Sequence, residues 1–184
     1  MANTDLRFTP STNGNRNKWT WSGWVKRSAI GEQSIFGAYQ SGTYNTSLRF
    51  AGDNKIHFED VYNGNTNGRI ITTALYRDLS AWYHIVAVFD NANAVSNDKI
   101  KVYVNGVNQV GAYGNAPTNA TTLNASNIPM QLGALGAGSY FNGLMSHVHF
   151  CDGYAYDASA FGETDSTTGE WKIKTDVSVT YGTN

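Results

Sequence analysis

Short segments in which apolar and polar residues alternate recur along the chain, and glycines and asparagines separate them. Alternation of this kind between turn residues, without a helical period, predicts antiparallel β-strands. The expected strands cover residues 19–26, 34–39, 46–51, 55–60, 69–74, 82–90, 99–105, 107–112, 130–133 and 140–151. Many short strands predict an all-β fold, an antiparallel β-sandwich of two sheets, and we expect one domain over residues 1–184.

A tight turn is expected where the strand at residues 99–105 ends. This strand and the one at 82–90 are rich in β-branched and aromatic residues, and the second runs into the pair Asn105-Gly106. Asn and Gly tolerate positive φ at both central positions of a two-residue turn. The pair therefore predicts a type I′ hairpin.

The strand at residues 19–26 indicates which face is buried. Trp19, Trp21 and Gly23 alternate on one face, whereas Trp24 lies on the other, more polar face. The glycine predicts a bend or a close approach of a neighbouring group. We expect a loop to cover Trp24.

Composition and charge exclude several classes of protein. The chain has 184 residues, of which 41% are hydrophobic, and its formal net charge is −1. This favours a packed core over disorder. The 13 Lys and Arg residues are scattered, which argues against a nucleic-acid partner because such binding needs a basic surface. Cys151 is the single cysteine, so an internal disulfide is excluded.

The sequence makes separate predictions for the first residues, for residues 115–127 and for residues 155–184. The first residues lack the basic and apolar parts of a secretory signal, and no run is long enough for membrane insertion, so we expect synthesis in a cytoplasm. Residues 115–127, mainly Ala, Thr, Asn and Ser, predict a long surface connection without charge, which suits a surface that packs on something. Residues 155–184 predict an irregular C-terminal extension, apart from residues 171–174.

Three stretches carry a resemblance to a known family. Residues 18–27 read KWTWSGWVKR, residues 140–153 read YFNGLMSHVHFCDG, and residues 161–172 combine FGETD with TGEWK. Together they resemble the concanavalin A-like, laminin G-like jelly-roll domains of structural proteins from tailed bacteriophages, especially marine and cyanobacterial ones. The resemblance implies a concanavalin A-like jelly roll in a virion protein assembled in the host cytoplasm: a surface appendage, fibre or decoration protein.

The same resemblance bears on partners. Relatives usually carry an apolar strand after a Tyr-Gly-Thr-Asn segment, which here is residues 181–184, and Leu6-Arg7-Phe8 reads as a short first strand. An unpaired sheet edge favours association. We expect a homo-oligomer, with other virion proteins and host-surface glycan as further partners; a natural minimal version of the domain is the alternative.

Carbohydrate binding needs aromatic faces for sugar C–H groups and amides or arginines for hydroxyls. The Gly-rich stretches 39–45 and 62–69 supply both. The candidate residues are Tyr39, Tyr44, Asn45, Tyr62, Asn63, Asn65 and Arg69, with Tyr76, Tyr113 and Tyr140 as further aromatic residues. The alternative is that these side chains form protein contacts or only cover a β-surface of low charge.

The loop at residues 90–98 carries carboxylate and amide oxygens, the ligands that calcium prefers. The candidate calcium ligands are Asp90, Asn91, Asn93, Asn97 and Asp98. Calcium is also more common than zinc in the family that the chain resembles. Asn and Asp in turns cap backbone groups without a metal. We therefore expect no required cofactor, with calcium as the one candidate.

Paired carboxylates are the other chemistry to consider. Glucanases of the same fold carry an E-x-D-x-x-E strand, and Glu163 and Asp165 match its first two positions, whereas Thr168 replaces the third. Glu59 and Asp60 are adjacent, so a strand places them on opposite faces. The sequence therefore argues against a glycosidase site.

His147, His149 and Cys151 alternate along one expected strand, which predicts that they face the same way. A His-x-His pair can bind a metal, but a polar sheet face is the favoured interpretation. The resemblance, taken together with the candidate carbohydrate-binding residues, implies non-enzymatic binding of host-surface carbohydrate by a virion protein as the expected function. The alternatives are a purely structural capsid or tail protein without a ligand and a polysaccharide-degrading, glucanase-like enzyme.

Overall fold

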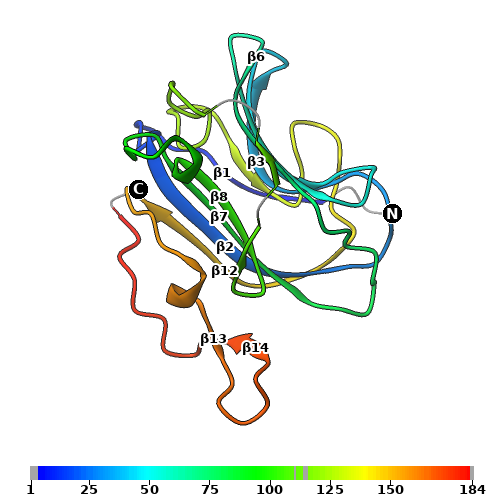
Figure 1. Ribbon diagram of the computed structural model, residues 1–184. Helices are drawn as coiled ribbons and strands as arrows, with labels where there is room; N and C mark the ends of the chain where they lie inside the picture. The colour runs from blue at the N-terminus through cyan, green and yellow to red at the C-terminus, as the bar shows by residue number, and fades with distance from the viewer. Residues whose placement is uncertain (1–3, 110, 114–115, 183–184) are drawn as a thin grey trace.

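Two antiparallel sheets pack face to face in the computed structural model, which describes residues 4–109, 111–113 and 116–182 (Figure 1). The large sheet has the order β1-β11-β3-β4-β5-β6-β10 and the small sheet the order β12-β2-β7-β8-β9. The large sheet consists of β1 (Leu6–Phe8), β3 (Gln33–Ser41), β4 (Tyr44–Phe50), β5 (Ile56–Tyr62), β6 (Asn65–Thr72), β10 (Gly111–Tyr113) and β11 (Met130–Leu132). The small sheet consists of β2 (Lys18–Arg27), β7 (Tyr83–Asp90), β8 (Ile100–Val104), β9 (Val107–Asn108) and β12 (Gly143–Asp152). The predicted two-sheet antiparallel sandwich, a concanavalin A-like jelly roll, is confirmed.

The core between the sheets follows the predicted alternation on β2. Trp19 lies against Phe58 of the large sheet and Phe89 of the small sheet, with ring centroids 5.4 and 5.8 Å away. A Cβ on Gly23 would lie 2.7 Å from the ring of Trp21, so the glycine leaves space for this indole. Both tryptophans are almost fully buried, as expected for the inner face of the strand.

Two hairpins close with Asn-Gly turns. Asn105 and Gly106 have φ values of 49° and 81°, which confirms the type I′ turn predicted between β8 and β9. Asn63 and Gly64, with φ values of 50° and 76°, form an equivalent turn between β5 and β6. The second turn places Tyr62 opposite Asn65 at the end of the large sheet.

Two predicted strands differ from the observed ones. Residues 107–112 were expected to form one strand, but β9 pairs with β8 in the small sheet and β10 with β6 in the large sheet, so the chain crosses between sheets here. Residues 140–151 were expected to be continuous, but β12 begins at Gly143. Its pairing with β2 is interrupted between Ser146 and His149 by a bulge.

The predicted surface connection at 115–127 is also only partly exposed. Thr121, Thr122, Leu123, Asn124 and Ala125 are buried, and Asn115 lies outside the described residues. The prediction of a surface segment was therefore wrong for residues 121–125. The reason is that backbone N–H groups of this segment find polar partners on the inner face of the large sheet, so the segment can be buried without losing hydrogen bonds.

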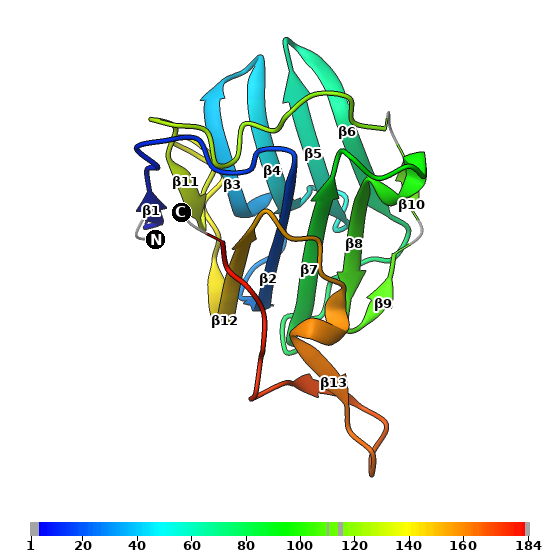
Figure 2. The same ribbon diagram turned by 90° about the vertical axis from the view of Figure 1, so that its left-hand side faces the viewer.

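The C-terminal segment packs on the outer face of the small sheet, where Figure 2 shows it crossing in front of the strands. It contains η2 (Ala158–Ala160) and the hairpin of β13 (Gly162–Thr164) and β14 (Trp171–Ile173), so the expected irregular extension has regular parts. A second apolar cluster fixes it there: its buried members are Val86, Val88, Cys151, Ala158 and Phe161. Trp24 is buried, and Ile173 of β14 lines a small pocket together with this indole.

A stack of three rings joins the C-terminal hairpin to the small sheet. His84 of β7 lies between Trp24 and Trp171, with centroid distances of 5.0 and 5.9 Å. The Trp171 indole N–H donates to His84 Nδ1 at 2.9 Å, so Nδ1 is the acceptor and the proton sits on Nε2, 2.9 Å from the Ser22 hydroxyl. Burial, with a smaller effect of His149, lowers the pKa of His84 to about 4 and keeps the ring neutral.

One short 3-10 helix remains, η1 (Ser96–Asp98), in the loop between β7 and β8. Among the described residues, no helix has the length and apolar character needed to cross a membrane.

Candidate functional site

The seven residues predicted for carbohydrate binding lie on or next to β3–β6, but on two faces of the large sheet. Tyr44 pairs with Tyr62, and Tyr62 pairs with Asn65. These residues lie on the inner face of the sheet, the face that also carries the core residues of the same strands. Tyr39 and Asn45 pair with each other on the opposite, outer face, and Arg69 lies on that face opposite Glu59. The prediction therefore combined two separate surfaces.

The first surface is a pocket at the end of the β5–β6 hairpin, which we call the hairpin-end pocket. Its volume is about 390 Å³, and its lining residues are Tyr62, Asn63, Asn65, Thr66, Asn67, Ala116, Thr118 and Asn119. Three of the predicted residues are among them. The lining combines one aromatic ring with several amide and hydroxyl groups, which is the composition of a site for a polar ligand with apolar faces.

The aromatic side of the pocket is a pair of tyrosines. The Tyr62 residue is 39% exposed, and the Tyr44 ring meets it edge-on with centroids 5.3 Å apart. The Tyr44 hydroxyl donates to Asn63 Oδ1 at 3.4 Å, and the Asn65 amide donates to the Asn63 carbonyl at 3.0 Å. Tyr44 thus supports Tyr62 and the turn, and Tyr62 presents its ring to solvent.

The opposite side of the pocket depends on Asn67, which the sequence analysis did not select. Asn67 is the extra residue of a β-bulge on β6, because Asp60 pairs with Gly68 and Val61 with Thr66. Its Oδ1 accepts from the backbone N–H groups of Thr118 and Asn119 at 3.1 and 3.0 Å. Its Nδ2 donates to the Asn119 carbonyl at 2.9 Å. This one amide therefore holds the loop that closes the pocket.

Asp60 lies behind Asn67 and is fully buried. Its Oδ2 accepts from Asn67 Nδ2 at 2.7 Å and its Oδ1 from the Thr46 hydroxyl at 2.5 Å. Thr46 Oγ1 in turn accepts from the backbone N–H of Thr122 at 3.0 Å. Burial raises the pKa of Asp60 to about 6, although these hydrogen bonds act in the opposite direction. The pocket loop is thus anchored to a buried carboxylate.

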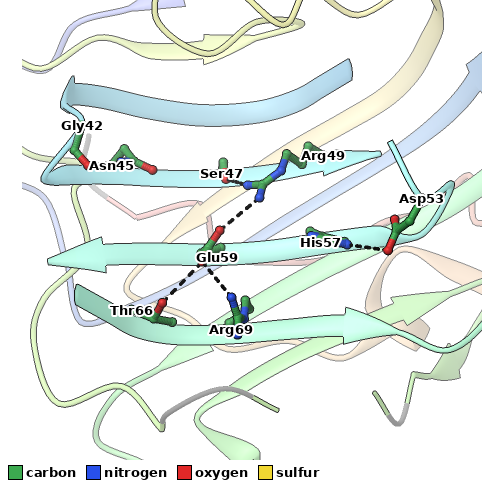
Figure 3. Close-up of polar contacts among 9 residues, drawn as sticks. All are labelled: Gly42, Asn45, Ser47, Arg49, Asp53, His57, Glu59, Thr66 and Arg69. Carbon is green, nitrogen blue, oxygen red and sulfur yellow. Dashed lines mark hydrogen bonds and ion pairs between the residues drawn. The ribbon is translucent and has the colours of Figure 1, made fainter. Parts of the chain in front are cut away.

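The second surface is the outer face of β4–β6, where Glu59 is bonded from three sides (Figure 3). Arg49 Nη2 lies 3.0 Å from Glu59 Oε2, and Arg69 Nη1 lies 3.5 Å from Glu59 Oε1. The Thr66 hydroxyl reaches Oε1 at 3.5 Å, and Arg49 Nη1 donates to the Ser47 hydroxyl at 2.5 Å. We call Ser47, Arg49, Glu59, Thr66 and Arg69 the arginine patch. Arg69 was predicted, Arg49 was missed, and Glu59 was considered only as a glycosidase carboxylate, because only the strand register brings the three together.

The remaining residues predicted for carbohydrate binding differ in whether their side chains are exposed and free to contact a ligand. Tyr39 is 41% exposed and packs against Gly136, where an added Cβ would lie 3.2 Å from its ring. Asn45 is directed to its own turn, since its amide donates to the Ser41 and Gly42 carbonyls. Tyr76 is buried, so its prediction as a surface aromatic was wrong: its ring fills the core beside Phe50 and Tyr83. Tyr140 is half-buried, and the side chain of Tyr113 lies outside the described residues.

The predicted calcium loop is only partly assembled. Asp90, Asn93 and Asp98 line one polar pocket of about 280 Å³ together with Lys101 and Asp157. Lys18 Nζ lies 3.1 Å from Asp90, and Lys101 Nζ lies 3.2 Å from Asp98. The other two predicted ligands are not in this pocket: Asn91 bonds with Asn17, and Asn97 is exposed. Within the described residues, no group of three or more His, Cys, Asp or Glu side chains is placed to hold a metal ion.

The carboxylates considered for a glycosidase have structural partners. Glu163 and Asp165 both contact Lys172 Nζ, at 3.4 and 3.1 Å, across the β13–β14 hairpin. Asp165 Oδ1 also accepts from the backbone N–H groups of Thr167 and Thr168, and these bonds, with Lys172, lower its pKa to about 2. Glu59 and Asp60 lie on opposite faces, as predicted. These groups stabilise turns and strands.

The predicted common face of His147, His149 and Cys151 was wrong for His147. Its φ is 49°, and it belongs to the bulge in β12, which turns it out of the alternation. His147 Nδ1 contacts the neighbouring Ser146 hydroxyl at 2.7 Å, whereas His149 Nδ1 contacts the Tyr181 hydroxyl at 2.8 Å. Cys151 is fully buried, and burial raises the pKa of its thiol to about 11.

Several solved structures share this fold. Domain 4 of AbnA, an arabinanase from Geobacillus stearothermophilus solved with arabinotriose, is 20% identical with a TM-score of 0.59, covering 83% of this chain and 68% of that one. The CBM40 domain of the Ruminococcus gnavus IT-sialidase, solved with α2,3 sialyllactose, is 13% identical with a TM-score of 0.53, covering 76% and 84%. The heptameric SAP-like pentraxin of Limulus polyphemus is 17% identical with a TM-score of 0.55, covering 79% and 68%. Similarity at these identities shows the fold alone.

Comparison with protein-family models identifies the family of the chain, which the structural similarities alone do not show. No curated protein matches the chain. The model of the concanavalin A-like lectin/glucanases superfamily matches residues 2–159, which includes both sheets but ends before β13. Since the match covers most of the chain, the chain belongs to the laminin G-like branch of the concanavalin A-like lectin/glucanase superfamily.

Proposed function

We propose that this protein is a non-enzymatic carbohydrate-binding protein and that the hairpin-end pocket is its sugar site. The observation that carries the proposal is the lining of the pocket, which combines the exposed ring of Tyr62 with the side-chain amides of Asn63, Asn65 and Asn119. Sugar rings pair C–H faces with aromatic rings and hydroxyls with amides. A pocket of about 390 Å³ has room for one or two sugar rings.

The similar structures support a sugar ligand. The AbnA domain was solved with arabinotriose and the CBM40 domain with α2,3 sialyllactose, so two proteins with this fold carry sugars. The engagement of Glu163 and Asp165 with Lys172 supports the non-enzymatic part of the proposal. We propose that binding requires no cofactor, because the Asp90 and Asp98 carboxylates have lysine partners.

We further propose that the protein is part of a bacteriophage virion, as an appendage, fibre or decoration protein that contacts host-surface glycan. The sequence motifs at 18–27, 140–153 and 161–172 support this role. The heptameric pentraxin supports a homo-oligomer as a state that this fold can adopt. Many copies would make a weak single site effective, because avidity multiplies individual affinities.

The test is binding of the fluorescent protein, displayed in many copies on a bead, to an array of bacterial surface polysaccharides. We expect saturable binding that free glycan competes. Tyr62→Ala should abolish it, since stacking on an aromatic ring contributes about 0.5–1.5 kcal/mol per site and many sites act together. Tyr154→Ala is the matched control, because Tyr154 is 40% exposed and lies away from the pocket. No binding to any glycan, or equal loss in both variants, would refute the proposed function.

A further inference from the structure

The arginine patch carries a positive charge that its own carboxylate does not balance. Glu59 is the one acidic member, and Arg49 is its close partner at 3.0 Å. The side chains of these two residues are 16% and 19% exposed, so they form a recessed pair. Arg69 contacts Glu59 only at 3.5 Å, and its side chain is 41% exposed. The patch is therefore a neutral ion pair with one further cation that faces solvent.

The other charged groups of this face are engaged elsewhere. His57 Nε2 contacts the Asp53 carboxylate at 3.3 Å, and Figure 3 shows this pair farther along the strands, at the β4–β5 turn. Asp53 Oδ1 also accepts from the Lys55 backbone N–H at 3.1 Å. This carboxylate therefore has its own partners, and Arg69 keeps its charge toward solvent.

The geometry favours a carboxylate as the ligand of Arg69. A guanidinium presents two parallel N–H donors that match the two oxygens of a carboxylate. The strand β6 holds Arg69 in place through its pairing with Glu59, and Glu59 also orients the guanidinium. A group that is held in place but still half-exposed loses little conformational entropy when it binds a partner.

Thr66 connects this surface with the hairpin-end pocket. The residue lines the pocket, and its hydroxyl contacts Glu59 in the arginine patch. Thr66 therefore marks the place where a sugar chain that leaves the pocket would pass onto the outer face of β6, toward Arg69. We infer that the protein recognises an acidic glycan and that Arg69 binds the carboxylate of a uronic or sialic acid residue. This inference rests on the proposed function, because the pocket must bind the adjoining sugar.

The experiment compares sugars that differ only in whether their carboxyl groups are charged or esterified. Binding is measured by calorimetry for tri-galacturonate and its methyl ester, and for 3′-sialyllactose and its methyl ester; the two pairs distinguish uronic from sialic acids. A sulfated lactose tests whether any anion suffices. We expect the acid of one pair to bind at least ~10-fold more tightly than its neutral partner at low salt, with the difference shrinking as salt rises. Stronger binding of the sulfate ester than of either acid would overturn the assignment to a carboxylate.

Two variants test whether Arg69 is the residue that causes the preference for the acidic sugar. Arg69→Gln should remove the preference for the acid and leave the affinity for the neutral sugar unchanged. Glu59→Gln should increase the preference, because it removes the competing carboxylate while keeping one acceptor oxygen. Arg77→Gln is the matched control, since it removes the same charge from an exposed position on the connection between β6 and β7. Thermal unfolding within about 2 °C of the wild type shows that each variant is folded.

The outcomes separate the inference from the proposed function. Equal affinity for acid and neutral sugars, with binding still dependent on Tyr62, would overturn the acidic-glycan inference alone. Equal losses in Arg69→Gln and Arg77→Gln would also overturn it, since the effect would then be general electrostatic attraction. Binding of neither member of either pair, together with an empty glycan array, would overturn the inference and the proposed function at once.

Discussion

The Trp171 indole fastens the C-terminal hairpin to the small sheet, and Trp171→Phe tests this attachment. Its N–H donates to His84 Nδ1, and its ring occupies the space beside two glycines. A Cβ on Gly106 or Gly162 would lie 2.6 or 2.5 Å from the indole, so the contacts are close on both sides. Phenylalanine keeps an aromatic ring but loses the donor and part of the volume.

The magnitude follows from these two losses. His84 is 1% exposed, so its Nδ1 would be left without a partner, which costs about 1–3 kcal/mol. The smaller ring leaves a void that costs about 1 kcal/mol more. We therefore expect the free energy of unfolding to fall by about 2–4 kcal/mol and Tm by on the order of 10 °C for a chain of this length.

Scanning calorimetry measures Tm, and hydrogen exchange measures the protection of the β13 and β14 amides. Trp82→Phe is the matched control, because Trp82 is 38% exposed and is expected to cost less than about 0.5 kcal/mol. If Trp171→Phe unfolds within about 2 °C of the wild type and β13 and β14 keep their protection, Trp171 does not fasten the hairpin.

Three further predictions concern other parts of the molecule. Because the pKa of His84 is lowered to about 4, its contribution to stability is complete above pH ~6.5 and is lost as pH falls toward 4. A stability profile for His84→Gln should be flatter over that range, and an unchanged slope would contradict this. Gly106→Ala should lower the free energy of unfolding by more than about 2 kcal/mol in denaturant titrations, because φ is 81° and Trp171 blocks the Cβ; a neutral effect would refute the turn geometry. Chelation with EDTA should leave Tm unchanged, because lysines already neutralise Asp90 and Asp98; a calcium-dependent rise in Tm would show a calcium site.

The sequence predicts the sandwich well because most strands follow a simple rule. Alternation on β2 places Trp19 and Trp21 in the core, and Asn105-Gly106 specifies its turn by the φ values that the two residues tolerate. The bulge at His147 could not be predicted in this way. A bulge shifts alternation by one residue, and no residue type in the segment requires it.

The burial of residues 121–125 and the role of Asn67 in holding the pocket loop could not be predicted, for a related reason. Hydropathy reports apolar side chains, whereas the backbone N–H groups of Thr122 and Leu123 donate to the Thr46 hydroxyl. Asn67 likewise accepts from backbone N–H groups far along the chain, those of Thr118 and Asn119. The candidate sugar-binding side chains were selected by amino-acid type alone. Their division between the hairpin-end pocket and the outer face depends on the strand register, which composition does not contain.

The central claim is that the hairpin-end pocket binds sugar, and an NMR titration of ¹⁵N-labelled protein with a glycan from the array tests it most directly. We expect the largest shift changes at the backbone amides of Asn65, Thr66, Thr118 and Asn119, all of which line the pocket. The control region is the β13–β14 hairpin, whose amides should not shift. Shift changes that saturate with the glycan but centre on the small sheet or on the β13–β14 hairpin would contradict the account.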